Sequence, residues 1–106
     1  MSESNPEERR FPMHKYELMC IIHPDLDEVA FNESIEKIKG WITELKGEIV
    51  TTDVWGRRRL AYLINKQREG QYVLFTTSMP PTSIIGLEQY LRFLEPLMRY
   101  MITVVE

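Results

Sequence analysis

The chain has 106 residues, which allows one domain with a single core and excludes a large enzyme with a separate cofactor domain. Its composition, 43% hydrophobic and 27% charged, is too apolar for a disordered chain and too evenly charged for a membrane protein. No apolar run approaches the roughly 20 residues that span a bilayer, and the first residues lack the apolar segment of a secretory signal. We therefore expect a cytoplasmic protein that does not contact a membrane.

The net charge of −3 argues at first against a nucleic-acid partner, but the charges are unevenly divided. Residues 1–53 carry 12 acidic and 6 basic side chains, whereas residues 54–106 carry 4 acidic and 7 basic ones. Because salt screens charges beyond about 8–10 Å, an acidic chain can still present a basic surface. The second half of the chain can therefore present a basic edge although the whole chain is mildly acidic.

The first half of the chain predicts a strand followed by a helix. Residues 1–12 are polar and aperiodic, and we expect a flexible extension before a single domain of residues 13–106. Residues 14–22 form an apolar run typical of a strand, in which Cys20, the only cysteine, is expected to be buried and unreactive. A carboxylate at Asp25, with glutamate three residues later, predicts the start of a helix. The helix has apolar residues at steps of three and four, and we expect it to end at a left-handed Gly47.

The second half predicts a hairpin, a helix and a last strand. Residues 48–65 are rich in β-branched and aromatic residues, and Gly56 among them indicates a bulge or bend. A turn over residues 66–70 and a strand over residues 71–79 complete the hairpin. A second helix is expected after residues 80–83, followed by a strand over residues 97–105. The order of elements predicts an α+β, ferredoxin-like fold with the split βαβ arrangement, in which a four-stranded antiparallel sheet carries two helices on one face.

The sequence gives little support to an enzyme. The only histidines, His14 and His23, lack metal-ligand spacing with a carboxylate or thiol. There is no glycine-rich phosphate loop and no Gly-x-Ser-x-Gly motif. Small acylphosphatases of similar fold bind phosphate with an arginine after the first strand, where residues 23–27 of this chain contain acidic residues and no arginine. We predict no catalysis, no metal, no cofactor and no small-molecule substrate.

Three consecutive arginines, Arg57, Arg58 and Arg59, are the most unusual feature of the sequence. Strand alternation sends Arg57 and Arg59 to one face and Arg58 to the other, and guanidinium groups match phosphate geometry. Trp55 and Tyr62, which flank the arginines, can stack on bases. The run therefore indicates an RNA-binding strand, the alternative being a charged edge strand that resists aggregation.

A second set of basic and aromatic residues comes from the two ends of the domain. His14, Lys15 and Tyr16 lie in the first predicted strand, and Arg99 and Tyr100 lie in the last. The predicted topology allows these strands to lie near each other, but the pattern does not show whether the two sets merge. Together they complete the candidate binding residues.

Several motifs occur in the order found in one known family. The most specific is Gly-x-Arg-Arg-Leu-Ala-Tyr, followed by Ile-x-Lys and Gly-x-Tyr, here residues 56–62, 64–66 and 70–72. With Met13 to Glu17 and Met98 to Met101, they make residues 13–105 resemble bacterial small-ribosomal-subunit protein six. One departure is Leu63, where the family commonly has proline, so we expect more regular strand pairing in this chain.

The resemblance implies a non-catalytic, ferredoxin-like protein of the ribosome. Its family binds the central domain of small-subunit ribosomal RNA as a heterodimer with ribosomal protein eighteen. By position, Arg58 and Arg59 fall on the family's arginine pair, Arg99 on an arginine of the last strand, and residues 14–16 on the basic opening of the first strand. The resemblance does not divide these residues between RNA and partner. The alternative function is a non-ribosomal module that recruits or regulates another protein on the same fold.

Overall fold

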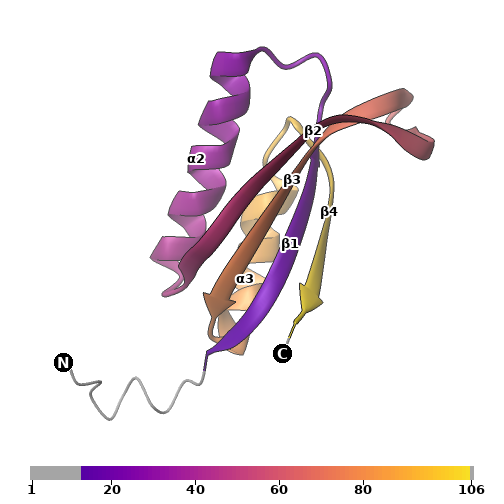
Figure 1. Ribbon diagram of the computed structural model, residues 1–106. Coiled ribbons are helices and arrows are strands. Elements are labelled where there is room, and N and C mark those ends of the chain that lie inside the picture. Colours follow the sequence, from indigo (N-terminus) through magenta and orange to yellow (C-terminus); the bar gives the residue numbers. More distant parts are fainter. Residues whose placement is uncertain (1–12, 106) are drawn as a thin grey trace, which may run out of the picture.

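The computed structural model describes residues 13–105, so the predicted extension over residues 1–12 lies outside the described residues. The elements follow the predicted order: β1 (His14–Ile22), α2 (Glu28–Glu44), β2 (Glu48–Ile64), β3 (Gln67–Met79), a 3-10 turn η1 (Pro81–Ser83), α3 (Ile84–Arg92) and β4 (Leu97–Val104). The strands form one sheet in the order β2-β3-β1-β4, with every neighbouring pair antiparallel. Both helices lie on the same side of the sheet (Figure 1). The ferredoxin-like fold is confirmed.

The core lies between the sheet and the two helices. Every second residue of β1 from Tyr16 to Ile22, and of β3 from Val73 to Met79, is buried against them, because alternate side chains of a strand point to one face. Phe75 is the largest of the fully buried side chains. Cys20 is fully buried as predicted, and burial raises the pKa of its thiol to about 12. The opposite side of the sheet carries no helix among residues 13–105, and we call it the open face.

Both ends of α2 differ in detail from the prediction. The helix is capped by Asp27 and not by Asp25, since the Asp27 carboxylate accepts a hydrogen bond of 2.8 Å from the backbone N–H of Ala30. At the other end the left-handed residue is Lys46, with φ 73°, and not Gly47. Position 47 needs a glycine because there is no room for a side chain: a Cβ atom there would lie 2.7 Å from the Cγ atom of Met79. The prediction of a left-handed Gly47 was therefore wrong.

The β2–β3 hairpin turns earlier than expected. Asn65 and Lys66 alone form the turn, both with positive φ (50° and 65°), and β3 begins at Gln67. Two residues with positive φ give the turn whose twist matches that of paired strands. Gly70, predicted within the turn, lies instead in β3, where a Cβ atom would come within 2.4 Å of the Cγ2 atom of Ile21. Strand β3 is therefore four residues longer than predicted, whereas β2 ends one residue earlier than predicted. The hairpin extends beyond the rest of the sheet (Figure 1).

Strand β2 is irregular along its length. Its register with β3 shifts between Ile49 and Thr51, between Val54 and Gly56, and between Arg59 and Ile64. Gly56, with φ 89°, lies at the second shift, as the prediction of a bulge required. Residues 60–63 have no partner in the register, so the more regular pairing expected from Leu63 is not found.

Candidate nucleic-acid interface

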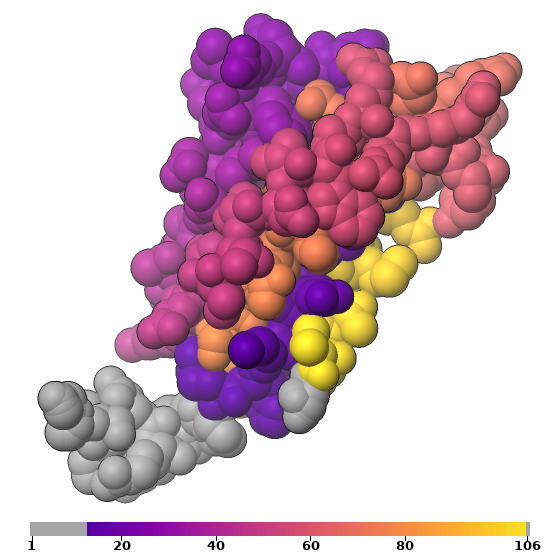
Figure 2. Space-filling model, viewed as in Figure 1, coloured from indigo at the N-terminus to yellow at the C-terminus, as the bar shows by residue number. Residues whose placement is uncertain are grey.

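The projecting part of the hairpin carries most of the positive charge of the second half of the chain. We call residues 55–72 the arm; it contains five cations and one anion, in a chain of net charge −3. The cations are Arg57, Arg58, Arg59, Lys66 and Arg68. In Figure 2 the arm is the pink and orange surface at the upper right, beside the yellow surface of β4. The local charge is therefore opposite in sign to the charge of the whole chain.

Arg58 and two aromatic residues form a stack on the open face. The ring of Trp55 lies parallel to that of Tyr72, with 6.3 Å between centroids and an interplanar angle of 4°. The guanidinium carbon of Arg58 lies 5.1 Å from the Trp55 ring centroid, at cation–π distance. The indole N–H of Trp55 donates to a carboxylate oxygen of Asp53 at 3.1 Å, which orients the ring. The stack holds a guanidinium in place while leaving it exposed to solvent.

Arg99 of β4 contacts the arm through Tyr62. Arg99 donates a hydrogen bond to the Tyr62 hydroxyl, and its guanidinium carbon lies 5.9 Å from the Tyr62 ring centroid. Arg99 pairs in register with Ile21, on the side of β1 that faces away from the core. The arm therefore reaches back across the open face to β4, and the structure brings Arg58, Tyr62 and Arg99 to the same side of the sheet.

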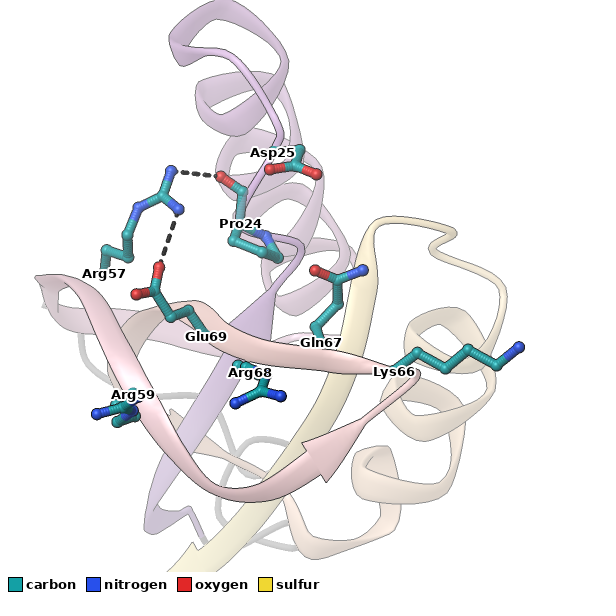
Figure 3. A pocket seen from close by; sticks show the side chains of 8 residues that line it. All are labelled: Pro24, Asp25, Arg57, Arg59, Lys66, Gln67, Arg68 and Glu69. Carbon is teal, nitrogen blue, oxygen red and sulfur yellow. Dashed lines mark hydrogen bonds and ion pairs between the residues drawn. The ribbon is translucent and has the colours of Figure 1, made fainter.

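Arg57 lies on the other side of the arm, as strand alternation predicted. It donates to the backbone carbonyl oxygen of Pro24 at 2.8 Å and to a carboxylate oxygen of Glu69 at 3.1 Å (Figure 3). Its partner in register, Gln71, donates through its side-chain nitrogen to the backbone carbonyls of His23 and Leu26 at 3.0 and 3.3 Å. Arg57 is thus engaged by the protein itself.

The remaining cations of the arm are exposed. The side chains of Arg59, Lys66 and Arg68 have no hydrogen-bond or ion-pair partner among residues 13–105. They line a concave surface of about 390 Å³ together with Arg57, but Figure 3 shows them pointing in different directions. They are suited to separate phosphates along an extended backbone and not to one enclosed anion.

Four of the predicted residues lie away from this cluster. Tyr16 is 7% exposed within the core, and Tyr100 packs against the core from β4, so neither ring is presented on the open face. His14 and Lys15 are exposed, but they lie at the opposite end of β1 from Ile21. Lys15 and Ile21 are six positions apart along the strand, which corresponds to about 20 Å. The first-strand residues and Arg99 therefore do not form one site.

Sequence reasoning missed three side chains that position the site: Glu69, Gln71 and Tyr72. Each pairs in register with the segment from Gly56 to Arg59, so the correct hairpin register would have identified them. The shift at Val54 and Gly56 is what sets Trp55 beside Tyr72. Apart from Gly56 itself, nothing in the amino-acid sequence indicates this shift in register.

Within residues 13–105, no group of three or more His, Cys, Asp or Glu side chains is arranged to hold a metal ion. None of the helices in this range is long and apolar enough to cross a membrane.

Comparisons with known proteins agree on one family. A family model described as ribosomal protein S6 matches residues 15–104. Small ribosomal subunit protein bS6 of Dictyoglomus turgidum is 45% identical over 94 residues, covering 89% of this chain and 97% of that protein, and the bS6 of Moorella thermoacetica is 37% identical over 89% and 96%. The crystal structure of 30S ribosomal protein S6 from Thermotoga maritima superimposes with a TM-score of 0.83 at 29% identity, over 87% of each chain. The chain therefore belongs to the ribosomal protein S6 family, and it is a structural protein of the small subunit of cytoplasmic ribosomes and not an enzyme, as the sequence predicted.

Proposed function

We propose that this protein binds the central domain of small-subunit ribosomal RNA, and that it does so jointly with ribosomal protein eighteen. The arm is the main RNA contact, through Arg58 and Arg59, with Arg99 extending the contact onto β4. The protein acts by positioning: its cations neutralise phosphates and set orientation, and base readout is minor. Family membership sets aside the non-ribosomal alternative.

The observation that carries this proposal is the concentration of cations on the projecting arm. Five cations against one anion give the arm a positive charge that the rest of this acidic chain lacks. The stack on Trp55 holds Arg58 exposed before any ligand arrives, which lowers the entropy lost when it binds a phosphate. Arg59 is exposed and engages no other side chain among residues 13–105. Both arginines therefore support phosphate binding.

A protein partner is supported by apolar side chains at the margins of the sheet. Strands β2 and β4 are the two edges, and each exposes large apolar residues. Val50 and Val54 of β2 are 49% and 52% exposed, and Met101 and Val104 of β4 are 56% and 60% exposed. A second protein that covers one edge and also touches RNA would raise the effective concentration of the arm at its binding site. Joint binding compensates for a small basic surface.

The proposal is tested by removing Arg58 and Arg59 together. The variant Arg58→Ala with Arg59→Ala should bind central-domain RNA, with protein eighteen present, about tenfold or more weakly than wild type. The slope of log affinity against log salt concentration should fall by about 1.5, because each lost phosphate contact removes about 0.7–0.9. Affinity is measured by titration at several salt concentrations, and folding is checked by circular dichroism.

The matched control removes two cations from α2, on the helix-covered side. Lys37→Ala with Lys39→Ala has the same charge change and should leave both the affinity and the salt slope close to those of wild type. Equal binding by the arginine variant and wild type at every salt concentration would contradict the assignment. An equal loss in both variants would show that net charge, and not the arm, determines binding.

A further inference from the structure

The first arginine of the triplet differs from the other two in what it contacts. Arg57 uses two guanidinium nitrogens at once, one on the Pro24 carbonyl and one on the Glu69 carboxylate. The Pro24 contact joins residues 33 apart in the chain. It therefore connects the arm to the loop of residues 23–27 between β1 and α2 (Figure 3).

Gln71 makes the same connection from the other strand of the arm. It faces Arg57 across the hairpin, and its side chain donates to the His23 and Leu26 carbonyls of the same loop. Two paired residues thus satisfy three backbone carbonyls of one loop. This loop leads directly into α2, whose first turn is capped by Asp27.

We propose that Arg57 is a positioning residue, which with Gln71 and Glu69 clamps the base of the arm to the 23–27 loop and so sets the angle at which the arm meets its ligand. The inference rests on the proposed function for the ligand, RNA, but the clamp itself is a property of the free protein. Arg57 is then set apart from Arg58 and Arg59, which bind phosphate directly.

Geometry supports this division of the triplet. A phosphate that binds Arg57 would have only the N–H groups that the Glu69 carboxylate and the Pro24 carbonyl leave free, and would lie close to the carboxylate charge. Arg59 lies on the same side of the arm, two residues away, and has no such partner among the described residues. The Arg57 guanidinium therefore joins the arm to the 23–27 loop, whereas the Arg59 guanidinium is available to bind a phosphate of RNA.

The clamp is tested first in the free protein, by amide hydrogen exchange. Arg57→Ala should speed exchange of the backbone amides in residues 57–59 and 69–71 about tenfold, since the base of the arm opens more often. Arg57→Lys keeps the charge, but one ammonium cannot reproduce both contacts, so exchange should rise in that variant also. The matched control, Arg59→Ala, should leave exchange unchanged. Unchanged exchange in Arg57→Ala overturns the clamp, whether or not the protein binds RNA.

The second readout is the salt dependence of RNA binding. Gln71→Ala removes no charge, so a clamp predicts weaker binding, by about threefold or more, at an unchanged salt slope. Arg57→Ala and Arg57→Lys should weaken binding in the same way, whereas Arg59→Ala should lower the slope by about 0.7–0.9. A lower slope in Arg57→Ala, or full recovery of affinity in Arg57→Lys, would identify Arg57 as a direct phosphate contact and overturn the inference. Absence of RNA binding by wild type would instead refute the proposed function and leave the exchange result decisive for the clamp.

Discussion

The two faces of one sheet differ in the role of their side chains: the covered face packs the core, and the open face presents cations to solvent. On the covered face, β1 and β3 bury Leu18, Cys20 and Phe75 against the helices almost completely. On the open face, the arm and β4 present Arg58 and Arg99 on aromatic rings that remain exposed to solvent. Strand alternation makes the division possible, because neighbouring residues point to opposite sides. Stability and binding can therefore change almost independently in this small domain.

The largest expected effect comes from truncating one large side chain on each face of the sheet. Phe75→Ala should lower the free energy of unfolding by about 3–5 kcal/mol, since it opens a cavity in a fully packed core. Trp55→Ala removes an aromatic side chain of similar bulk from the open face, where it is 39% exposed, and should cost no more than about 1.5 kcal/mol. Urea denaturation of both variants measures the two values. Similar losses of stability in the two variants would show that the open face also stabilises the fold.

The thiol of Cys20 tests the burial of the covered face through pH. Its pKa is about 12 in the folded protein against an ordinary value of 9.0, because burial penalises the thiolate. Between these values the unfolded chain loses this proton and the folded chain keeps it, so rising pH favours unfolding. The contribution of Cys20 to stability should be constant below pH 9 and should fall above it, by at most about 1.4 kcal/mol per pH unit.

Other groups titrate in the same range, so the measurement is a difference between two proteins. Urea denaturation at several pH values from 7 to 11 is compared for wild type and Cys20→Ala, which lacks the thiol. Stability should fall more steeply above pH 9 in wild type than in Cys20→Ala. Parallel curves would mean that the Cys20 thiol is as accessible to water in the folded protein as in the unfolded chain.

The smallest expected effect belongs to the contact that joins β4 to the arm. Tyr62→Phe removes the hydroxyl that accepts from Arg99 and keeps the ring. Because this hydrogen bond is exposed, the free energy of unfolding should change by less than about 0.5 kcal/mol, measured by urea denaturation. A loss of more than about 1.5 kcal/mol in the free energy of unfolding would contradict the difference between the two faces, because an open-face contact would then hold the sheet together.

The sequence was sufficient for the fold and for the covered face. Spacing in residues 31–45 and the apolar run of residues 14–22 reflect burial directly, so the elements and most of the core could be predicted. The ends of elements were harder, because a cap depends on one side chain and one φ value: Asp27 and not Asp25 caps α2, and Lys46 and not Gly47 is left-handed. Which of two neighbouring residues takes such a position depends on tertiary contacts, such as the close approach of Met79 to Gly47.

The open face could be predicted only in part, since it depends on strand register. Alternation placed Arg58 opposite Arg57 and Arg59, and the contacts of Arg57 and Arg58 agree. Simple alternation would also put Trp55 on the side of Arg57, but the shift after Val54 moves it to the side of Arg58. The contact between Arg99 and Tyr62 arises from the way the arm curves back, which no local pattern shows.

Joint binding is the central claim, and one titration tests it most directly. Central-domain ribosomal RNA is titrated with this protein in the absence and presence of ribosomal protein eighteen, at a fixed salt concentration near that of the cell. We predict weak binding alone and an affinity at least about a hundredfold higher with the partner, as expected when linked contacts raise effective concentration. Equal affinity in both titrations would contradict the account, because the arm would then need no partner to hold RNA.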